Sequence, residues 1–353
     1  MRALGPLAMA CLLALAAPAA AQQSNGEQSI DPSRFGDAVE PKDAVGPPPV
    51  KMLKSKEVTP KVVEPQDPAE INPNRFGEKP ADEAYGAFQR GLYKTAYNLA
   101  LPRAEKDDGP AQALLAEILS RGLGVRLDFE AAAKWYQRAA GHNIPAAQFQ
   151  YALMLMDGKY VKKDEAAAIK MMQASADAGN TLAQFNYAQM LTKRESGPEG
   201  VRKALPYYKN AAESGLPDAQ YAMSQISSNG IGGVGKDDKE ARRWLTLAAR
   251  QGYDTAELDL GTWLVDGRGG DRDMKAGFTW MRRAAASGNV AAMNRLAKLY
   301  MNGLGTDPDS IEATAWYFQA RRAGLNDFVM NDFLAGLTEE ELKKALERTN
   351  RLR

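Results

Sequence analysis

The sequence has little of the chemistry that most catalytic and metal sites require. Its 353 residues include one cysteine and one histidine. Zinc and related transition-metal cages need three or four nitrogen or sulfur ligands, so this composition excludes them. The same shortage argues against Ser/His and Cys/His nucleophilic catalysis. We therefore expect no enzyme activity, no metal site and no bound cofactor.

An excess of charge of either sign is also missing. The chain has 45 Lys and Arg against 44 Asp and Glu, a net charge of +1. Nucleic-acid binding draws its affinity from many phosphate-neutralising cations, so we expect no nucleic-acid partner. What the chain does have is 44% apolar residues, a content typical of a globular protein with a real core.

Residues 1–21 have the pattern of a secretory signal peptide. Arg2 provides a basic start, an apolar run extends from Leu7 to Ala17, and a small-residue cleavage site ends at Ala21. The run is short for a membrane span of roughly 20 apolar residues. We expect export to the periplasm or the medium, with membrane contact only through the signal peptide if it stays uncleaved.

Cleavage after residue 21 would remove Arg2 and Cys11 and no acidic residue. Subtracting Arg2 from the 45 basic residues leaves 44 against 44 acidic ones, so the mature chain would be neutral. It would also have no cysteine and could form no disulfide. The stability of the mature protein must therefore come from packing.

Residues 22–80 predict a disordered linker. They hold ten of the nineteen prolines and no Trp or Tyr, and neither helical nor strand periodicity survives among the prolines. A motif, I-[DN]-P-[SN]-R-F-G, occurs in them twice, with its Arg-Phe pair at Arg34-Phe35 and at Arg75-Phe76. It is either a duplication in a spacer or a bivalent tag that docks into a partner or into the chain's own groove. Two linked copies would raise avidity.

The rest of the chain repeats itself about every 36 residues. An Ala-Gln pair or a variant of it starts each unit, at Ala111, Ala147, Ala183, Ala219, Ala256 and Ala292. Counting that Ala as register one, registers five and eight are apolar and register six is small in all six units. Registers one, five and eight share one helix face, so the first half of each unit predicts an amphipathic helix.

Glycine and aspartate mark the ends of the predicted helices. Glycine closes the first helix at Gly122, Gly158, Gly230, Gly267 and Gly303. Aspartate, a good N-cap, opens the second helix at Asp128, Asp164, Asp237, Asp273 and Asp309. A single helix pair cannot bury its own apolar face, but stacked pairs can. The repeat therefore predicts an all-α fold, an α/α solenoid of helix-turn-helix units.

These residues resemble the Sel1-like repeat family, relatives of the tetratricopeptide repeats. The fullest match is the Gly-Leu-Gly-Val turn at 122–125 followed by Trp-x3-Ala-Ala at 135–140. We expect six repeats over 111–325, a degenerate leading helix pair over 81–110, and C-terminal capping helices over 326–353. The last helix should begin at a capping box on Thr338. The resemblance implies that the protein binds other proteins. It also implies a role in envelope signalling, surface-polysaccharide control or host interaction.

The third unit, 183–218, departs from this pattern. It has Arg194 where the closing glycine is expected, and Pro206 lies inside its second helix. Proline removes a backbone hydrogen bond, so we expect a kink or changed curvature there. Whether this irregularity serves as a functional hinge is left open, and sequence drift within a repeat is the favoured explanation.

Four features that look chemical have structural explanations. The G-x-G-x-x-G sequence at 230–235 follows a helix, not the strand that a dinucleotide fingerprint needs. The repeated aspartates cap helices one per unit. His142 lies in a turn and is expected at the surface. Trp263, at register eight, is expected in the core.

A binding surface is what remains. Registers four, seven and eleven should face away from the core of each first helix and line the concave groove found in related solenoids. The polar residues there are Glu117, Arg121, Gln150, Asp157, Asn186, Gln189, Lys193, Gln225, Asn229, Asp259, Thr262, Asp266, Arg295, Lys298 and Asn302. Such a lining suits an extended peptide held through its main chain.

Two functions therefore stay open. The first is a periplasmic, non-enzymatic scaffold or regulatory adaptor that binds another protein or an extended peptide. The second is a protein that binds cell-wall or envelope polymer, with hydrolysis as an added possibility, in which Asp259 and Asp266 would matter most. The sequence does not decide the oligomeric state.

Overall fold

A computed structural model describes residues 82–352, and every regular element in that range is an α-helix. The expected signal peptide, the linker and the paired motif at Arg34-Phe35 and Arg75-Phe76 lie outside the described residues. The helices are α1 (Glu83–Gln89), α2 (Tyr93–Glu105), α3 (Gly109–Arg121), α4 (Phe129–Gly141), α5 (Pro145–Asp157), α6 (Glu165–Asp177), α7 (Thr181–Arg194), α8 (Pro198–Glu213), α9 (Pro217–Asn229), α10 (Asp238–Arg250), α11 (Asp254–Asp266), α12 (Met274–Ala286), α13 (Val290–Asn302), α14 (Ser310–Arg322), α15 (Phe328–Ala335) and α16 (Glu339–Arg351).

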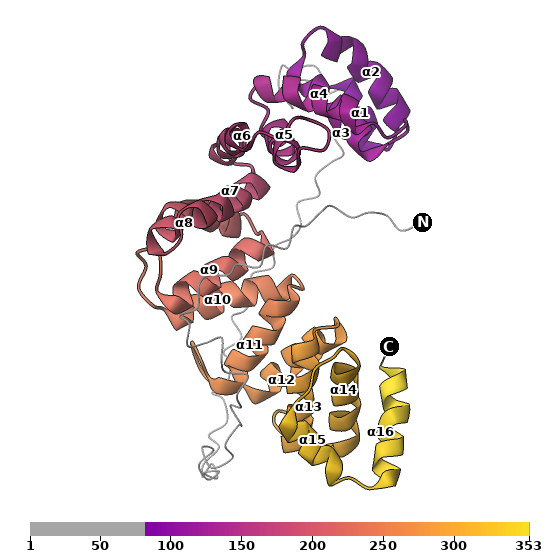
Figure 1. Ribbon diagram of the computed structural model, residues 1–353, viewed down its shortest axis with the longest axis vertical. Coiled ribbons are helices and arrows are strands. Elements are labelled where there is room, and N and C mark those ends of the chain that lie inside the picture. Colours follow the sequence, from indigo (N-terminus) through magenta and orange to yellow (C-terminus); the bar gives the residue numbers. More distant parts are fainter. Residues whose placement is uncertain (1–81, 353) are drawn as a thin grey trace, which may run out of the picture.

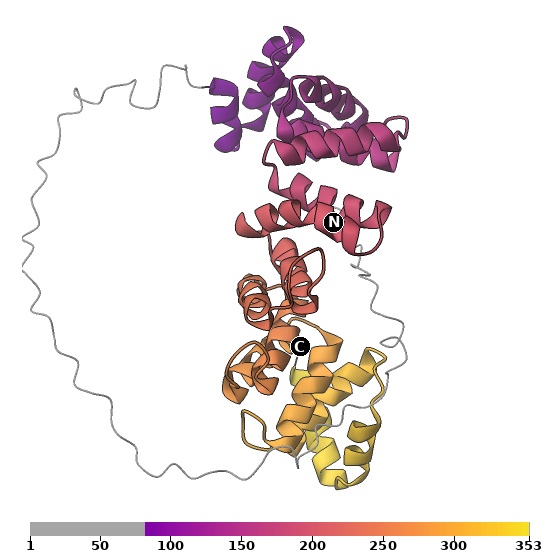
Figure 2. The same cartoon turned by 90° about the vertical axis from the view of Figure 1, so that its left-hand side faces the viewer.

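The helices form antiparallel pairs that stack in chain order. Helices α1 and α2 make the leading pair, α3 to α14 make six pairs, and α15 and α16 close the stack (Figure 1). The stack follows an open arc with its first and last helices on the same side (Figure 1), and from the side the pairs lie one beneath another (Figure 2). The predicted all-α solenoid is confirmed.

The predicted helix signals act where they were expected. Each of the five aspartates at the start of a second helix accepts a hydrogen bond from a backbone N–H two or three residues later. Each of the five closing glycines adopts the left-handed conformation that ends a first helix. The repeated aspartates are thus fully used as caps.

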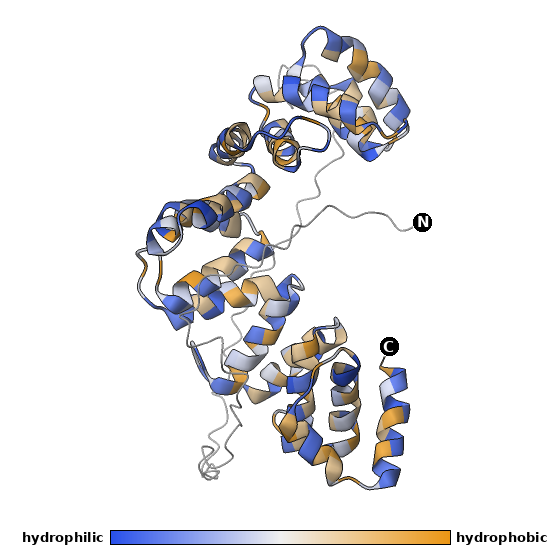
Figure 3. Ribbon diagram, viewed as in Figure 1, coloured by the Kyte–Doolittle hydropathy of each residue, from blue (hydrophilic) through white to orange (hydrophobic). Residues whose placement is uncertain are grey.

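The core runs between the helix pairs rather than within any one of them. Registers one, five and six are buried in every repeat, with Leu115 and Leu296 fully enclosed. Register eight is buried in four repeats but only half-buried as Met154 and Met190. Figure 3 shows orange and blue segments on the same helices, as expected when one face packs and the other meets water.

Register two of the first four repeats holds a buried glutamine that ties the repeat to the helix pair before it. In four repeats the glutamine donates a hydrogen bond to a carbonyl in the last turn of the preceding second helix. The pairs are Gln112 with Ala104, Gln148 with Ala140, Gln184 with Ala176 and Gln220 with Ala212. The fifth repeat has Glu257 in this place, which cannot donate when ionised.

The irregular third repeat keeps its helices. Helix α7 runs on to Arg194 because no glycine stops it, and α8 continues as one helix through Pro206 to Glu213. At the C-terminus, α16 begins with the expected capping box between Thr338 and Glu341. The solenoid is therefore capped at its end by a polar helix, as its solubility requires.

Candidate partner-binding surface

We call the fifteen polar residues predicted at registers four, seven and eleven the polar row. All of them are exposed or half-buried in the structure. Two apolar residues at register four, Leu114 and Ala222, are buried instead, although exposure was expected there. Register four lies only about 60° from register one around the helix, so it forms the edge of the core face. The polar row is therefore at least partly exposed to solvent along its length.

In the C-terminal repeats the polar row is joined across helices. The Tyr221 hydroxyl of α9 donates to the Asp259 carboxylate of α11 over 3.0 Å. The Arg295 guanidinium of α13 donates to the Thr262 hydroxyl of α11. The polar rows of repeats 5 and 6 are thus bonded to each other, and Tyr221 of repeat 4, at register three beside the row, is bonded to the row of repeat 5.

Burial shapes the electrostatics of this stretch. Desolvation raises the pKa of Asp259, against the opposing effects of the Tyr221 hydrogen bond and of the Arg295 and Arg268 charges. Desolvation and the Asp259 charge together raise the pKa of Tyr221. The phenol therefore keeps its proton at neutral pH and stays a donor to the carboxylate.

Lys298 forms an ion pair with Asp327 at the C-terminal end of the solenoid. Its ammonium group lies 2.8 Å from Asp327 Oδ2, which also accepts a hydrogen bond from the Asn294 amide at 2.8 Å. The other oxygen of Asp327 caps α15 at the N–H of Met330. Burial alone would raise the pKa of Asp327, but Lys298 and Asn294 bring it below its usual value. The ammonium group of Lys298 is thus already paired within the protein.

The N-terminal repeats have a different lining. Glu117 accepts a hydrogen bond from the Tyr136 hydroxyl at 2.9 Å and pairs with Arg121 one turn along the same helix. Among the described residues, Gln150 and the ammonium of Lys193 make no side-chain hydrogen bond or ion pair. These side chains keep their full hydrogen-bonding capacity for a partner.

Sequence reasoning missed the aromatic part of this surface. The half-buried rings of Tyr221 and Tyr253 lie 5.1 Å apart beside Asp259. A signal existed in register three, which is aromatic in three successive repeats as Phe149, Phe185 and Tyr221. Half-buried tyrosines are common anchors in protein interfaces because they combine a large apolar ring with a hydroxyl.

The other sequence motifs have the structural roles expected of them. The 230–235 sequence forms the turn between α9 and α10. His142 is exposed and its Nε2 lies 3.2 Å from Asp107 Oδ1. Hydrogen bonds from Gln112, His142 and Arg138 lower the pKa of Asp107 to about 2. Trp263 is buried in the core, as expected.

The described residues contain no group of three or more His, Cys, Asp or Glu side chains placed to hold a metal ion. Over the same range, none of the helices combines the length and the apolar character needed to cross a bilayer.

Comparison with solved structures shows the same fold in two bacterial proteins. One is a protective antigen of uropathogenic Escherichia coli strains with an SLR fold; it is 28% identical over 74% of this chain, with a TM-score of 0.53. The match spans only 64% of that protein. The other is a Sel1 repeat protein from Oxalobacter formigenes, 23% identical over 69% of this chain and 97% of its own, with a TM-score of 0.57. Among curated proteins, none matches the sequence.

The family model for the Sel1 repeat matches six segments that together make up more than half of the chain. They are residues 109–143, 145–180, 181–216, 217–253, 255–289 and 290–325, which correspond to the six helix pairs from α3 to α14. The chain therefore belongs to the Sel1 repeat family.

Proposed function

We propose that this protein is a non-enzymatic scaffold or regulatory adaptor of the bacterial periplasm, which binds another protein through the polar row. Sel1 repeats are typically protein-interaction modules, and the family is generally a non-catalytic scaffold. The observation that carries the proposal is the bonding between repeats along this surface. Tyr221 bonds to Asp259 and Arg295 to Thr262, so neighbouring repeats offer one surface rather than separate patches.

The chemistry of the row suits an extended peptide of a partner protein. Amides such as Gln150, Gln189 and Gln225 can both donate to and accept from a peptide main chain. The tyrosine pair at Tyr221 and Tyr253 would bury an apolar side chain of that peptide. Affinity would then come from the main chain along the row and selectivity from the tyrosine pair.

The periplasmic part of the proposal has its support in the N-terminal sequence. Residues 1–21 have the order of a secretory signal, and the rest of the chain holds no cysteine. The E. coli protein of similar fold is a protective antigen. An adaptor that works outside the cytoplasm fits both facts.

Site-specific photocrosslinking in the native envelope would test the proposal. A benzophenone amino acid at Gln150 or Gln225 should trap the same protein from both positions, because both lie in the polar row. The matched controls are Lys170 and Arg250, which are exposed on the second helices α6 and α10. If the row positions trap nothing, or if the controls trap the same protein equally well, the proposal is wrong.

The envelope-polymer alternative has no structural observation in its favour. The Asp259 carboxylate on which it depends already accepts the Tyr221 hydroxyl. Sedimentation of the purified protein with peptidoglycan, lost in Asp259→Ala and Asp266→Ala, would nevertheless establish polymer binding and displace the adaptor proposal.

A further inference from the structure

The turns of the regular repeats close against the preceding repeat at one residue, the second glycine of Gly-x-Gly. This glycine has a positive φ and packs on the first turn of the preceding second helix. A Cβ atom would lie 2.9 Å from Lys94 N at Gly124, 2.7 Å from Val201 Cγ1 at Gly232, 2.2 Å from Asp238 O at Gly269, and 2.1 Å from Met274 O at Gly305. At these four junctions only glycine fits.

The second repeat has Tyr160 at this position. Its φ is not positive, in contrast to the four glycines, so this turn follows a different course. The Tyr160 ring stacks on Phe129, the first residue of α4, with centroids 4.7 Å apart and planes at 17°. An aromatic ring thus lies between two segments that approach each other closely at the four glycine junctions.

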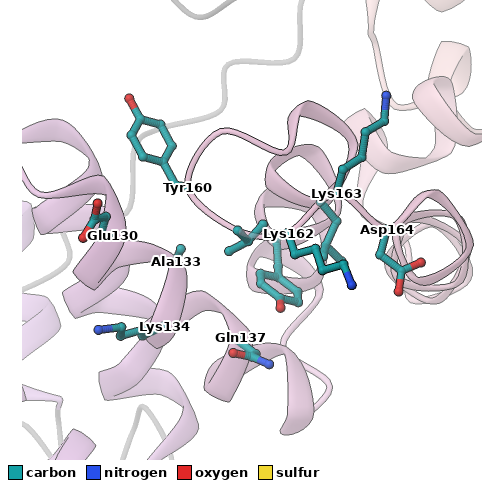
Figure 4. Close-up of a pocket in the computed structure, with 11 residues that line it drawn as sticks. Glu130, Ala133, Lys134, Gln137, Tyr160, Lys162, Lys163 and Asp164 are labelled. Atoms are coloured by element: carbon teal, nitrogen blue, oxygen red, sulfur yellow. The ribbon is translucent and has the colours of Figure 1, made fainter.

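A cavity of about 510 Å³ lies at this junction, between α4 and the turn that joins α5 to α6 (Figure 4). Its apolar part comes from Tyr151 and Leu155 of α5 and from Val161 of the turn. Its polar part includes Lys134 of α4 and Lys162 of the turn. This volume suits two or three residues of a peptide.

A second hollow of about 400 Å³ extends the first one. It shares Glu130 and Lys134 of α4 and adds Trp135, over which the Arg138 guanidinium lies at 4.8 Å. The two hollows flank the exposed side of α4, so a ligand that uses both must be elongated. An extended peptide meets that requirement better than a compact small molecule.

The basic and acidic side chains at the junction differ in whether they have bonding partners. Lys134, Lys162 and Lys163 make no hydrogen bond or ion pair within the described residues. Of the three acids that line the two hollows, Asp164 caps α6 through the N–H of Ala167 and Asp128 caps α4 through the N–H of Ala131. Glu130 lies in the first turn of α4, where the helix dipole favours it. The charges without a partner are therefore mostly positive.

We propose that this junction is a second docking site, which takes an acidic segment of a partner protein. The carboxylates of that segment would face Lys134 and Lys162, and an apolar side chain would lie on Tyr151, Leu155 and Val161. None of these residues belongs to the polar row. The second docking site therefore goes beyond the proposed function and can be tested independently of it.

Fluorescence anisotropy with a synthetic probe tests the site on the full chain. The probe is a fluorescein-labelled peptide, Gly-Ser-Glu-Leu-Glu-Asp-Leu-Glu-Ser-Gly, and its counterpart has Lys in place of every acidic residue. The acidic peptide should bind about tenfold more tightly than its counterpart, because attraction becomes repulsion in the swap. Equal binding of the two peptides would overturn the proposal.

Charge reversal on the protein gives the complementary result. The double variant Lys162→Glu/Lys163→Glu should weaken binding of the acidic peptide by about tenfold. The matched control is Lys170→Glu, an exposed position on α6 outside the cavity, which should change binding by less than about twofold. Equal effects of the two variants would also overturn the proposal.

The role of Tyr160 has its own test. Tyr160→Gly restores the glycine found at the four regular junctions, so the turn should close and the acidic peptide should lose about tenfold in affinity while the protein stays folded. Unchanged binding in a folded variant would show that the tyrosine does not make the site. If phosphatidylglycerol vesicles bind through Lys162 and Lys163 and the peptide does not, the surface belongs to a membrane and the proposal is wrong.

Discussion

Two junctions of the solenoid are built from equivalent helices but differ in how closely the turn packs. One joins repeats 1 and 2, and the other joins repeats 5 and 6. At the latter, Gly305 brings the turn into backbone contact with Met274. At the former, Tyr160 stands on Phe129 and a cavity lies beside it. Glycine in the turn accompanies a close backbone approach at one junction and tyrosine accompanies a cavity at the other, while α4 and α12 have the same length.

The polar row follows the same division. Near the C-terminus its side chains bond across repeats, Asp259 to Tyr221 and Arg295 to Thr262, and Lys298 bonds to Asp327 at the terminal cap. Near the N-terminus Glu117 bonds only within its own repeat, and Gln150 and Lys193 have no side-chain partner among the described residues. A partner that binds the C-terminal repeats meets a preorganised surface, whereas the N-terminal repeats offer unused hydrogen-bonding groups. Preorganisation lowers the entropic cost of binding, so we expect the tighter contacts at the C-terminal end.

The largest effect should come from placing a tyrosine in the closed seam. Gly305→Tyr puts a Cβ 2.1 Å from Met274 O at a residue with φ of 76°. The left-handed backbone and the clash should together lower the free energy of unfolding by about 3 kcal/mol, measured by urea denaturation.

Gly288→Tyr is the matched control for that variant. Gly288 has φ of 97° and nothing within 4 Å of an added Cβ, so the same substitution costs only the backbone strain, about 1–2 kcal/mol. Equal losses in the two variants would mean that the seam opens freely around any side chain. The contrast between the two junctions would then have no steric basis.

The fold could be predicted almost completely from the sequence, because its signals are local and repeat. Apolar residues at registers one, five and eight, aspartate at the helix starts and glycine at the helix ends act within a few residues of each other. The kink expected at Pro206 stays a prediction: α8 runs on through this residue as one helix, and a proline bends a helix without ending it.

The candidate sites could be predicted only in part, for a physical reason. The exposure of Asp266, at register eleven, follows from the helical angle alone, whereas register four is buried in some repeats and half-buried or exposed in others. The bond between Tyr221 and Asp259 joins residues 38 apart and depends on how one repeat turns relative to the next. The cavity beside Tyr160 was missed because the second repeat was interpreted as regular, although comparison of the six turns shows the missing glycine.

An intermediate loss in the free energy of unfolding should come from removing the Asp327 carboxylate near the C-terminus. Asp327→Ala removes the acceptor of Lys298 and Asn294 and the cap of α15. We expect a loss of about 2–3 kcal/mol in the free energy of unfolding at pH 7. Asp128→Ala, which removes only the cap bond to Ala131, should cost about 1 kcal/mol.

The pH dependence of the Asp327 variant has a definite sign. The folded-state pKa of Asp327 is lowered, so its contribution is present above its unfolded pKa of about 4 and is lost as pH falls through the folded value. The difference between wild type and Asp327→Ala should therefore shrink in acid. A difference that stays constant down to pH 2 would show that packing, not the carboxylate, holds α15.

The smallest effect concerns Glu257, the one acid among the register-two amides. Its side chain is 1% exposed, and Arg283 Nε lies 2.7 Å from Oε1 as an ion pair without hydrogen-bond geometry. Glu257→Gln should let the amide donate to Ala249 O, as the glutamine does in four other repeats. We expect a gain of about 1 kcal/mol in the free energy of unfolding at pH 7.

Titration separates this explanation from a simple change in packing. Burial first, and then the Asp254 charge, raise the pKa of Glu257, while Arg283 opposes them. A raised folded pKa means that the stability the group contributes is full below its unfolded pKa of about 4.3 and is lost as pH rises through the folded value. The gain from Glu257→Gln should therefore be largest near neutral pH and fade toward pH 4. The reverse change in the third repeat, Gln184→Glu, should lose stability with the same pH dependence, because it places a carboxylate against Ala176 O. A gain that is independent of pH would mean that the ion pair with Arg283 fully compensates the burial of the Glu257 charge.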